Sequence, residues 1–221
     1  MAHAHNNFDY PVMLKLADKK CVIIGGGTVA ARKLTTLCEA GAQVTCIAPA
    51  FAPELLQQAS AFGCTLIQEL FQPEQLQNAF LVVAATDNFA VNRTITEAAP
   101  CLCNNITEPQ LSNFTVPSSI KVGSLTVTIA TGGIPGYTRL LRQYLQKKLN
   151  PAFGSFNDFL LEQRKIIKEA ASSSEERTLF WRHVLNENLL LLLENENIEQ
   201  AKEQIQNAVD SFRTQSQNGT C

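Results

Sequence analysis

A glycine-rich segment, IGGGTVAARKL, contains the residues whose spacing points most directly to chemistry. Gly25, Gly27 and Ala30 form the pattern G-x-G-x-x-A between an apolar run and a helical pattern. The first glycine permits a tight turn, the second lets a pyrophosphate approach the backbone, and the alanine allows close packing of helix on strand. Free N–H groups and the positive end of a helix dipole would face the phosphates. The segment therefore predicts a dinucleotide site; the alternative is a glycine-rich turn that binds nothing.

Two further segments are expected to border the same site. The second predicted strand ends in IAPAF, with neither an acid nor an arginine, so backbone groups around Ala48, Pro49 and Ala50 would meet the adenosine ribose. This criterion does not distinguish NAD from NADP. A later strand ends in AATDN, where Thr86 could hydrogen-bond a ribose or a phosphate. Asp87 is either functional or part of a plain helix N-cap.

Alternating apolar runs and helical patterns must position these segments. Strands that alternate with helices imply a parallel sheet with right-handed crossovers. The predicted fold class is therefore α/β, with a Rossmann-type parallel sheet in the N-terminal half. The predicted strands are 21–24, 43–48, 64–70, 80–86 and 101–106, and the predicted helices are 28–40, 53–62, 73–79 and 89–99.

The pattern changes near residue 111. Two β-rich runs surround KVGS at 121–124 and predict a hairpin. The next helix has an apolar side, and residues 151–213 are predicted to be almost entirely helical, with an N-cap serine in SSSEE. The chain thus has three parts: an α/β unit, a β-containing middle and a helical end.

Composition narrows the range of partners. The formal net charge of −2 gives no electrostatic reason to expect nucleic acid or an anionic membrane, and no apolar stretch approaches the roughly 20 residues that span a bilayer. The start, MAHAHNNFDY, lacks the pattern of a secretory signal, and its histidines are interpreted as part of a flexible polar end rather than a metal site. Seven cysteines, with only Cys101 and Cys103 close together, favour reduced thiols in a cytoplasm over a zinc site.

Several segments, in this order, resemble the precorrin-2 dehydrogenase family, the siroheme synthase module that in some members is also a sirohydrochlorin ferrochelatase. They are YPVMLKLADKKCVIIGGGTVAARKLTTLCEAGAQVTCIAPAF, LVVAATDNFAVN, CNNITEPQLSNFTVPSSIKVGSLTVTIATGG and RLLRQYLQKKL, which together span about residues 10–150, and FWRHVL resembles the family's helical end. The resemblance implies a homodimer with an NAD-binding Rossmann domain (1–112), a dimerisation region (113–150) and a helical C-terminal domain (151–221). It also implies that hydride passes from precorrin-2 to NAD, giving sirohydrochlorin, and that some members then insert Fe²⁺.

Carried over by position, the resemblance implies a set of cofactor contacts, and the sequence departs from the family pattern at two places, the first of them at Thr107. Family members carry an aspartate with an acid/base role in a pattern like C-N-x-x-D, but CNNITEP places Thr107 there. Glu108 is adjacent and either substitutes for it or is a solvated loop acid. The implied cofactor contacts are Gly25, Gly26, Gly27, Thr28, Val29, Ala48, Pro49, Ala50 and Thr86.

The substrate implied by the resemblance carries many carboxylates, so cations are expected around it. Arg139 and Arg142 share one face of the helix that follows Gly132 and Gly133, although each could be a plain surface charge. The glycine turn itself, GGIPGYTRLLR, is one residue shorter than the family pattern and lacks its serine.

The interpretation is an NAD-dependent precorrin-2 dehydrogenase, cytoplasmic and homodimeric, with weak or absent ferrochelatase activity. Two alternatives stay open. One is a sensor or carrier that binds a dinucleotide or a tetrapyrrole and has lost catalysis. The other is an unrelated NAD(P) oxidoreductase on the same fold.

Overall fold

The computed structural model describes residues 9–218. The chain divides into two compact units, one ending at Thr115 and the other beginning at Val116. The N-terminal histidines and Cys221 lie outside the described residues. No helix among the described residues is long and apolar enough to cross a membrane.

The first unit is built on five parallel strands in the order β3-β2-β1-β4-β5. Strand β1 pairs with β2 on one side and with β4 on the other, so the chain reverses its direction of travel across the sheet after β3. This order is that of a Rossmann dinucleotide-binding sheet, which confirms the predicted fold class. The strands are β1 (Lys20–Ile24), β2 (Gln43–Ile47), β3 (Thr65–Ile67), β4 (Leu81–Ala84) and β5 (Leu102–Asn105).

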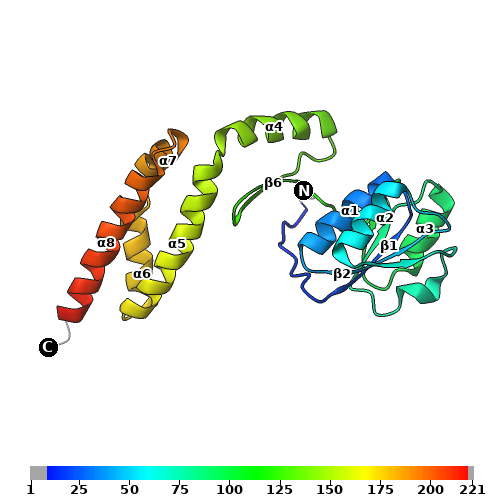
Figure 1. Ribbon diagram of the computed structural model, residues 1–221, viewed down its shortest axis with the longest axis horizontal. Helices are drawn as coiled ribbons and strands as arrows, with labels where there is room; N and C mark the ends of the chain where they lie inside the picture. The colour runs from blue at the N-terminus through cyan, green and yellow to red at the C-terminus, as the bar shows by residue number, and fades with distance from the viewer. Residues whose placement is uncertain (1–8, 219–221) are drawn as a thin grey trace, which may run out of the picture. The chain divides into compact units, whose positions relative to one another are not determined.

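Helices cover both faces of this sheet because side chains of β1 alternate between two apolar cores. Cys21 and Ile23 pack in one core, and Val22 and Ile24 in the other. Helices α1 (Thr28–Glu39) and α2 (Pro53–Phe62) join the first core, while α3 (Phe89–Ala98) joins the second (Figure 1). A parallel sheet buried in this way needs continuous apolar strands, as the sequence has.

Two sequence predictions in this unit were too long. The strand expected over 64–70 is only β3, because β3 is an edge strand and its partner β2 ends at Ile47, opposite Ile67. The helix expected over 73–79 is a single 3₁₀ turn, η1 (Pro73–Leu76), which stops before Asn78 enters the left-handed region at φ 60°. A second such turn, η2 (Pro109–Leu111), follows β5.

Cysteines fill part of these cores. All six described cysteines are free, and Cys21, Cys46 and Cys103 are buried. Burial raises the pKa of the Cys21 thiol to about 11 and that of Cys46 to about 12. Among the described residues, His, Cys, Asp and Glu form no group of three that could hold a metal ion.

The second unit begins with the predicted hairpin. Strands β6 (Ser118–Val122) and β7 (Leu125–Ile129) are antiparallel and are joined by two residues, of which Gly123 has φ 57°. Helix α4 (Pro135–Lys148) follows, and none of its residues is buried. Its predicted apolar side, with Tyr137, Leu140 and Tyr144, is therefore exposed within this unit.

Four helices complete the second unit and share one apolar core around Phe156, Phe180 and Ile205. Ser173 caps α6 as predicted, because its hydroxyl accepts the Glu176 N–H at 3.1 Å. The run ENLLLLLE forms a helix of its own, α7, which the sequence analysis did not single out because five successive leucines show no one-sided pattern. The helices are α5 (Pro151–Ala170), α6 (Ser174–Val184), α7 (Glu187–Glu194) and α8 (Ile198–Asn218).

Candidate functional site

The glycine turn lies where β1 and β4, the two strands on either side of the topological reversal, reach their carboxyl ends. In an open α/β sheet the ligand crevice forms at this point. The N–H of Gly25 donates to Ile47 O at 2.9 Å, and the N–H of Ala85 donates to Ile24 O at 2.8 Å. These hydrogen bonds fix the turn against β2 and β4.

The three glycines of this turn are required for different reasons. Gly25 has φ 137°, and a Cβ built on it would lie 2.2 Å from Ala85 O. A Cβ on Gly26 would lie 1.9 Å from Ala50 O, so both positions exclude a side chain for reasons of packing. A Cβ on Gly27 would meet nothing within 4 Å. The open space beside Gly27 is therefore available to a ligand.

The N-terminus of α1 faces the same space. Gly27 is its N-cap and offers no capping side chain, and the first turn carries no acidic residue. The first N–H groups of a helix have no partner within the helix, and the macrodipole makes this end electropositive. A pyrophosphate would satisfy these N–H groups, so this end of α1 fits the phosphates of a dinucleotide.

A cavity of about 720 Å³ surrounds the turn. All nine predicted cofactor contacts line it. It also includes residues that the sequence analysis did not name, among them Leu70 and Phe71, which follow β3 at the same edge of the sheet. Parallel topology places them there, although no local motif marks them. The predicted contacts are Gly25, Gly26, Gly27, Thr28, Val29, Ala48, Pro49, Ala50 and Thr86.

Charge is nearly absent from this cavity. Asp87 is the one ionisable side chain among the residues that line it, and no arginine or lysine does so. A 2′-phosphate on the adenosine ribose would need a cationic partner. The lining therefore suits NAD better than NADP.

A buried asparagine holds Thr86 in place. Asn92, on α3, is completely buried, and its side-chain oxygen accepts from both the N–H and the hydroxyl of Thr86, at 3.1 and 2.7 Å. Its side-chain NH₂ donates to Thr86 O at 2.9 Å and to the Thr107 hydroxyl at 3.1 Å. Asn92 thus joins the end of β4 to the loop after β5. The sequence analysis missed it, because nothing in the motif distinguishes this asparagine from a surface helix residue.

Comparison with known proteins agrees with this geometry. The family model described as "Putative NAD(P)-binding" matches residues 12–118, and the model described as "Sirohaem synthase dimerisation region" matches residues 152–209. The siroheme synthase of Nitrosospira multiformis is 40% identical over 183 residues, covering 79% of this chain and 39% of that protein. The siroheme synthase of Methylobacillus flagellatus is 34% identical over 178 residues, covering 79% of this chain and 38% of that protein. The chain belongs to the siroheme synthase family.

The chain spans about two fifths of the length of these curated siroheme synthases. Among solved structures, SirC, a precorrin-2 dehydrogenase, superposes with a TM-score of 0.71 and 24% sequence identity, covering 88% of this chain and 99% of that one. At this identity the match shows that the two chains share a fold. Membership in the siroheme synthase family confirms the resemblance drawn from the sequence.

Thr107 occupies the position where the resemblance implies an aspartate, and its hydroxyl is engaged in the structure. It donates to Asn105 Oδ1 at 2.9 Å and accepts from Asn92. Asn105 Oδ1 also accepts the N–H groups of Thr107 and Glu108, each at 3.0 Å. Thr107 does not line the dinucleotide cavity, although its neighbour Ile106 does.

Glu108 is paired rather than free. Its carboxylate accepts from Arg93 at 2.5 Å, and its side chain is 14% exposed. The hydrogen bond to Glu108 raises the pKa of the Arg93 guanidinium, which keeps its charge. Like Thr107, Glu108 is not among the residues that line the cavity.

Asp87 differs from these two residues. Its neighbour Asn88 is the N-cap of α3, with Oδ1 accepting the Val91 N–H at 3.1 Å, so Asp87 is not needed as the cap. Asp87 is exposed and lines the cavity. Of the three predicted catalytic residues, it is the one that the cavity includes.

The predicted substrate-binding residues lie in the second unit. Gly132 and Gly133 precede α4 with φ values of 62° and 95°. Arg139 and Arg142 are exposed on α4. Their role stays a prediction.

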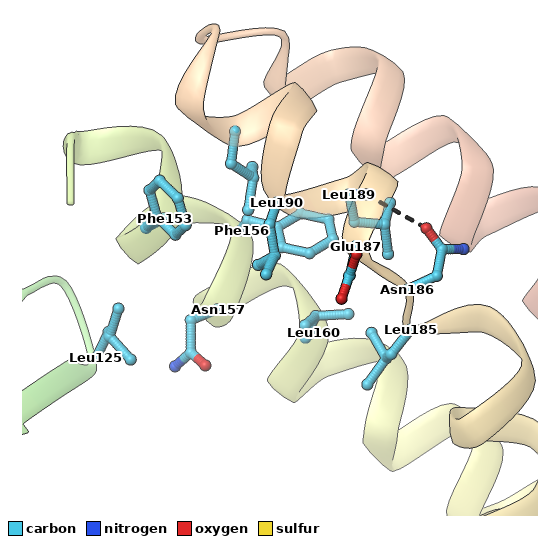
Figure 2. Close-up of a pocket in the computed structure, with 11 residues that line it drawn as sticks. Leu125, Phe153, Phe156, Asn157, Leu160, Leu185, Asn186, Glu187, Leu189 and Leu190 are labelled. Atoms are coloured by element: carbon cyan, nitrogen blue, oxygen red, sulfur yellow. Dashed lines mark hydrogen bonds between the residues drawn. The ribbon is translucent and has the colours of Figure 1, made fainter. Parts of the chain in front are cut away.

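The helical unit has an apolar groove of its own, of about 440 Å³ (Figure 2). Phe153, Phe156 and Leu160 of α5 face Leu189 and Leu190 of α7 across it (Figure 2). Glu187 is the one ionisable residue among those that line the groove. The groove therefore offers packing surface rather than catalytic groups, and all its lining residues except Leu125 lie within the residues that the dimerisation model matches.

Proposed function

We propose that this chain catalyses the NAD-dependent oxidation of precorrin-2 to sirohydrochlorin. The observation that carries the proposal is the glycine-lined cavity at the reversal of the sheet, lined by no arginine or lysine, in a chain of the siroheme synthase family. In this reaction NAD accepts a hydride from the tetrapyrrole, and one proton is released.

The residues of the first unit bind and orient the reactants. Backbone N–H groups at Gly27 and the first turn of α1 receive the pyrophosphate, and Ala48 to Ala50 meet the ribose. Asn92 fixes Thr86 through three hydrogen bonds, so the Thr86 hydroxyl and backbone keep one position beside the cofactor. Positioning of this kind supplies most of what hydride transfer needs from the protein.

We assign to Asp87 the acceptance of the proton that is released during the oxidation. It lines the cavity, is exposed and is not the helix cap. Glu108 is held by Arg93, and the Thr107 hydroxyl is bonded to Asn105 and Asn92. A carboxylate can accept a proton near neutral pH, whereas a threonine hydroxyl cannot.

Arg139 and Arg142 are proposed to bind carboxylates of the substrate beside the turn at Gly132 and Gly133. Arginine forms bidentate hydrogen bonds with carboxylates, and the two side chains lie three residues apart on α4. Iron insertion, with Fe²⁺ as a substrate, is proposed to be slow or absent, because it needs a base that removes two pyrrole protons.

The chain is proposed to act as a homodimer in the cytoplasm. Tyr137, Leu140 and Tyr144 of α4 are 51 to 61% exposed, and a two-stranded hairpin is marginal by itself. Pairing with a second copy would cover the α4 face and the groove of Figure 2. Light scattering should give twice 24.3 kDa, and a strictly monomeric mass at micromolar concentration would contradict the dimer. The free thiols fit a reducing compartment.

Anaerobic incubation with precorrin-2 and NAD, followed by absorbance, tests the reaction. We expect NADH and sirohydrochlorin to appear together. If NAD and precorrin-2 bind by calorimetry but neither product forms, the chain is a binding protein of the same fold. If NAD binds and precorrin-2 does not, the chain is a member of the family that oxidises another substrate.

A further inference from the structure

A polar cavity lies between α5 and α6 of the helical unit, and it shares no lining residue with the dinucleotide cavity or the apolar groove. Its volume is about 310 Å³. Figure 1 shows α5 and α6 running side by side in the helical unit. The residues that line the cavity are Arg164 and Lys168 of α5, and Ser174, Arg177, Thr178 and Trp181 of α6.

Helical spacing gathers these side chains. Arg164 and Lys168 are four residues apart and share a face of α5. On α6, Ser174, Thr178 and Trp181 follow one another at intervals of four and three residues, so they form one stripe. The cavity is thus built from two facing helix stripes rather than from a loop.

The charged side chains that line this cavity are all positive. It is lined by three cations and no carboxylate. Neighbouring lysines on the same helical unit do find acids, since Lys165 pairs with Glu162 and Lys202 with Glu199. Among the described residues, by contrast, no ion pair or hydrogen bond occupies the three cationic groups of the cavity.

The N-terminus of α6 adds to the positive potential. Ser174 is the first residue of this helix, and the macrodipole places a partial positive charge there. The first turn has two acids, Glu175 and Glu176, and neither lines the cavity. The Glu176 carboxylate accepts from the N–H and the hydroxyl of Ser172, both at 2.7 Å. These hydrogen bonds lower the pKa of Glu176 and hold it at Ser172.

We propose that this cavity binds the phosphate group of a small molecule. Two guanidinium groups and an ammonium, arriving from two helices, can surround a tetrahedral dianion from several directions, and arginine matches phosphate with paired N–H donors. A single carboxylate carries one charge and would leave two cations unbalanced. The Ser174 hydroxyl supplies a further donor, and Trp181 offers an aromatic face to any ring that carries the phosphate.

Trp181 makes the proposal directly measurable, because it is the only tryptophan of the chain. The intact protein is titrated with inorganic phosphate, and separately with phenyl phosphate, at constant ionic strength, with tryptophan fluorescence and calorimetry recorded together. We expect a saturable signal. Tighter binding of phenyl phosphate indicates a ligand with a ring, and equal binding indicates free phosphate; both outcomes support a phosphate site.

Variants localise the signal. R164Q and R177Q should each weaken binding about 10-fold, since each removes a charge-assisted hydrogen bond. The matched control is R182Q, which makes the same change on α6 at a residue that does not line the cavity, and it should bind as the original chain does. Circular dichroism checks that α5 and α6 still fold in each variant.

Four results would overturn the proposal. Three are a response that does not saturate, an equal loss in R182Q, and tighter binding of citrate than of phosphate at matched charge; the fourth concerns G27V. The proposal is independent of the dinucleotide site, which is tested by G27V: this variant should keep the phosphate response at Trp181. Loss of the response in G27V would mean that the signal comes from the glycine turn.

Discussion

Replacement of Gly27 by valine separates cofactor binding from folding. The backbone at Gly27 has φ −89° and ψ −173°, an extended conformation that any L-residue adopts, and a Cβ there meets nothing within 4 Å. Surface substitutions without a clash change the free energy of unfolding by about 0.5 kcal/mol or less. The midpoint of urea unfolding should therefore stay close to that of the original chain.

The same side chain should abolish most of the NAD affinity. It would project into the cavity at the N-terminus of α1, where the pyrophosphate approaches the backbone. A hydrogen bond to a charged group contributes about 1.5–3 kcal/mol, so loss of two such bonds costs about 3–6 kcal/mol. This corresponds to a dissociation constant at least about 100-fold larger. Isothermal titration calorimetry with NAD measures it.

Two comparisons make the experiment decisive. Gly136→Val makes the same change at another glycine whose Cβ would meet nothing within 4 Å, in α4, and should leave NAD affinity unaltered. Gly25→Ala should unfold or strongly destabilise the first unit, because its Cβ would lie 2.2 Å from Ala85 O. An unchanged NAD affinity in a folded Gly27→Val variant would refute the assignment of the glycine turn.

Four further predictions concern the chemistry and the polar network. Asp87→Asn should lower the rate of precorrin-2 oxidation by about 10²-fold or more at unchanged NAD affinity. The control, Glu108→Gln, should change this rate little. If Asp87→Asn oxidises precorrin-2 as fast as the original chain, Asp87 has no catalytic role. Asn92→Ala should lower the free energy of unfolding by about 1–3 kcal/mol and weaken NAD binding. If the stability falls but NAD affinity does not change, the role of Asn92 is structural only. Thr107→Asp should leave NAD affinity unchanged and raise neither oxidation nor iron insertion, because its carboxylate would face the acceptor Asn105 Oδ1 outside the dinucleotide cavity; a rise in either activity would place residue 107 in the site. The free energy of unfolding should fall above pH 9, because burial raises the pKa of the Cys46 thiol to about 12 in the folded chain, whereas the unfolded thiol loses its proton near pH 9.0. Urea unfolding at several pH values should show a smaller fall in this free energy for Cys46→Ala.

The sequence predicted which residues gather at the carboxyl edge of the sheet in the first unit, for a physical reason. Parallel strands bring all their carboxyl ends to one edge of the sheet, so residues after β1, β2 and β4 gather there once the strands are identified. The nine predicted contacts all line one cavity because each is the local end of a strand or the start of α1. Leu70 and Phe71 obey the same rule but were missed, since the predicted strand 64–70 includes Leu70 and ends just before Phe71, whereas β3 ends at Ile67.

Local sequence patterns could not predict the hydrogen-bond network around Asn92. Asn92 binds Thr86 and Thr107, six and fifteen residues away, and those hydrogen bonds depend on how α3 packs on β4 and β5. Whether Glu108 was a solvated loop acid or a catalytic substitute could not be decided without its partner Arg93, fifteen residues earlier. Sequence spacing predicts which elements meet, whereas partners of individual polar side chains depend on packing.

At Thr107, the role that the resemblance implies does not fit the hydrogen bonds of the structure. The resemblance places an acid/base aspartate there, but this hydroxyl donates to Asn105 Oδ1, and that oxygen also accepts two backbone N–H groups. An aspartate at this position would bring a second acceptor against Asn105 Oδ1, in place of the donor that the hydroxyl provides. Threonine therefore suits the loop as it is folded here. This arrangement supports our proposal that proton transfer belongs to Asp87, the one carboxylate among the residues that line the cavity.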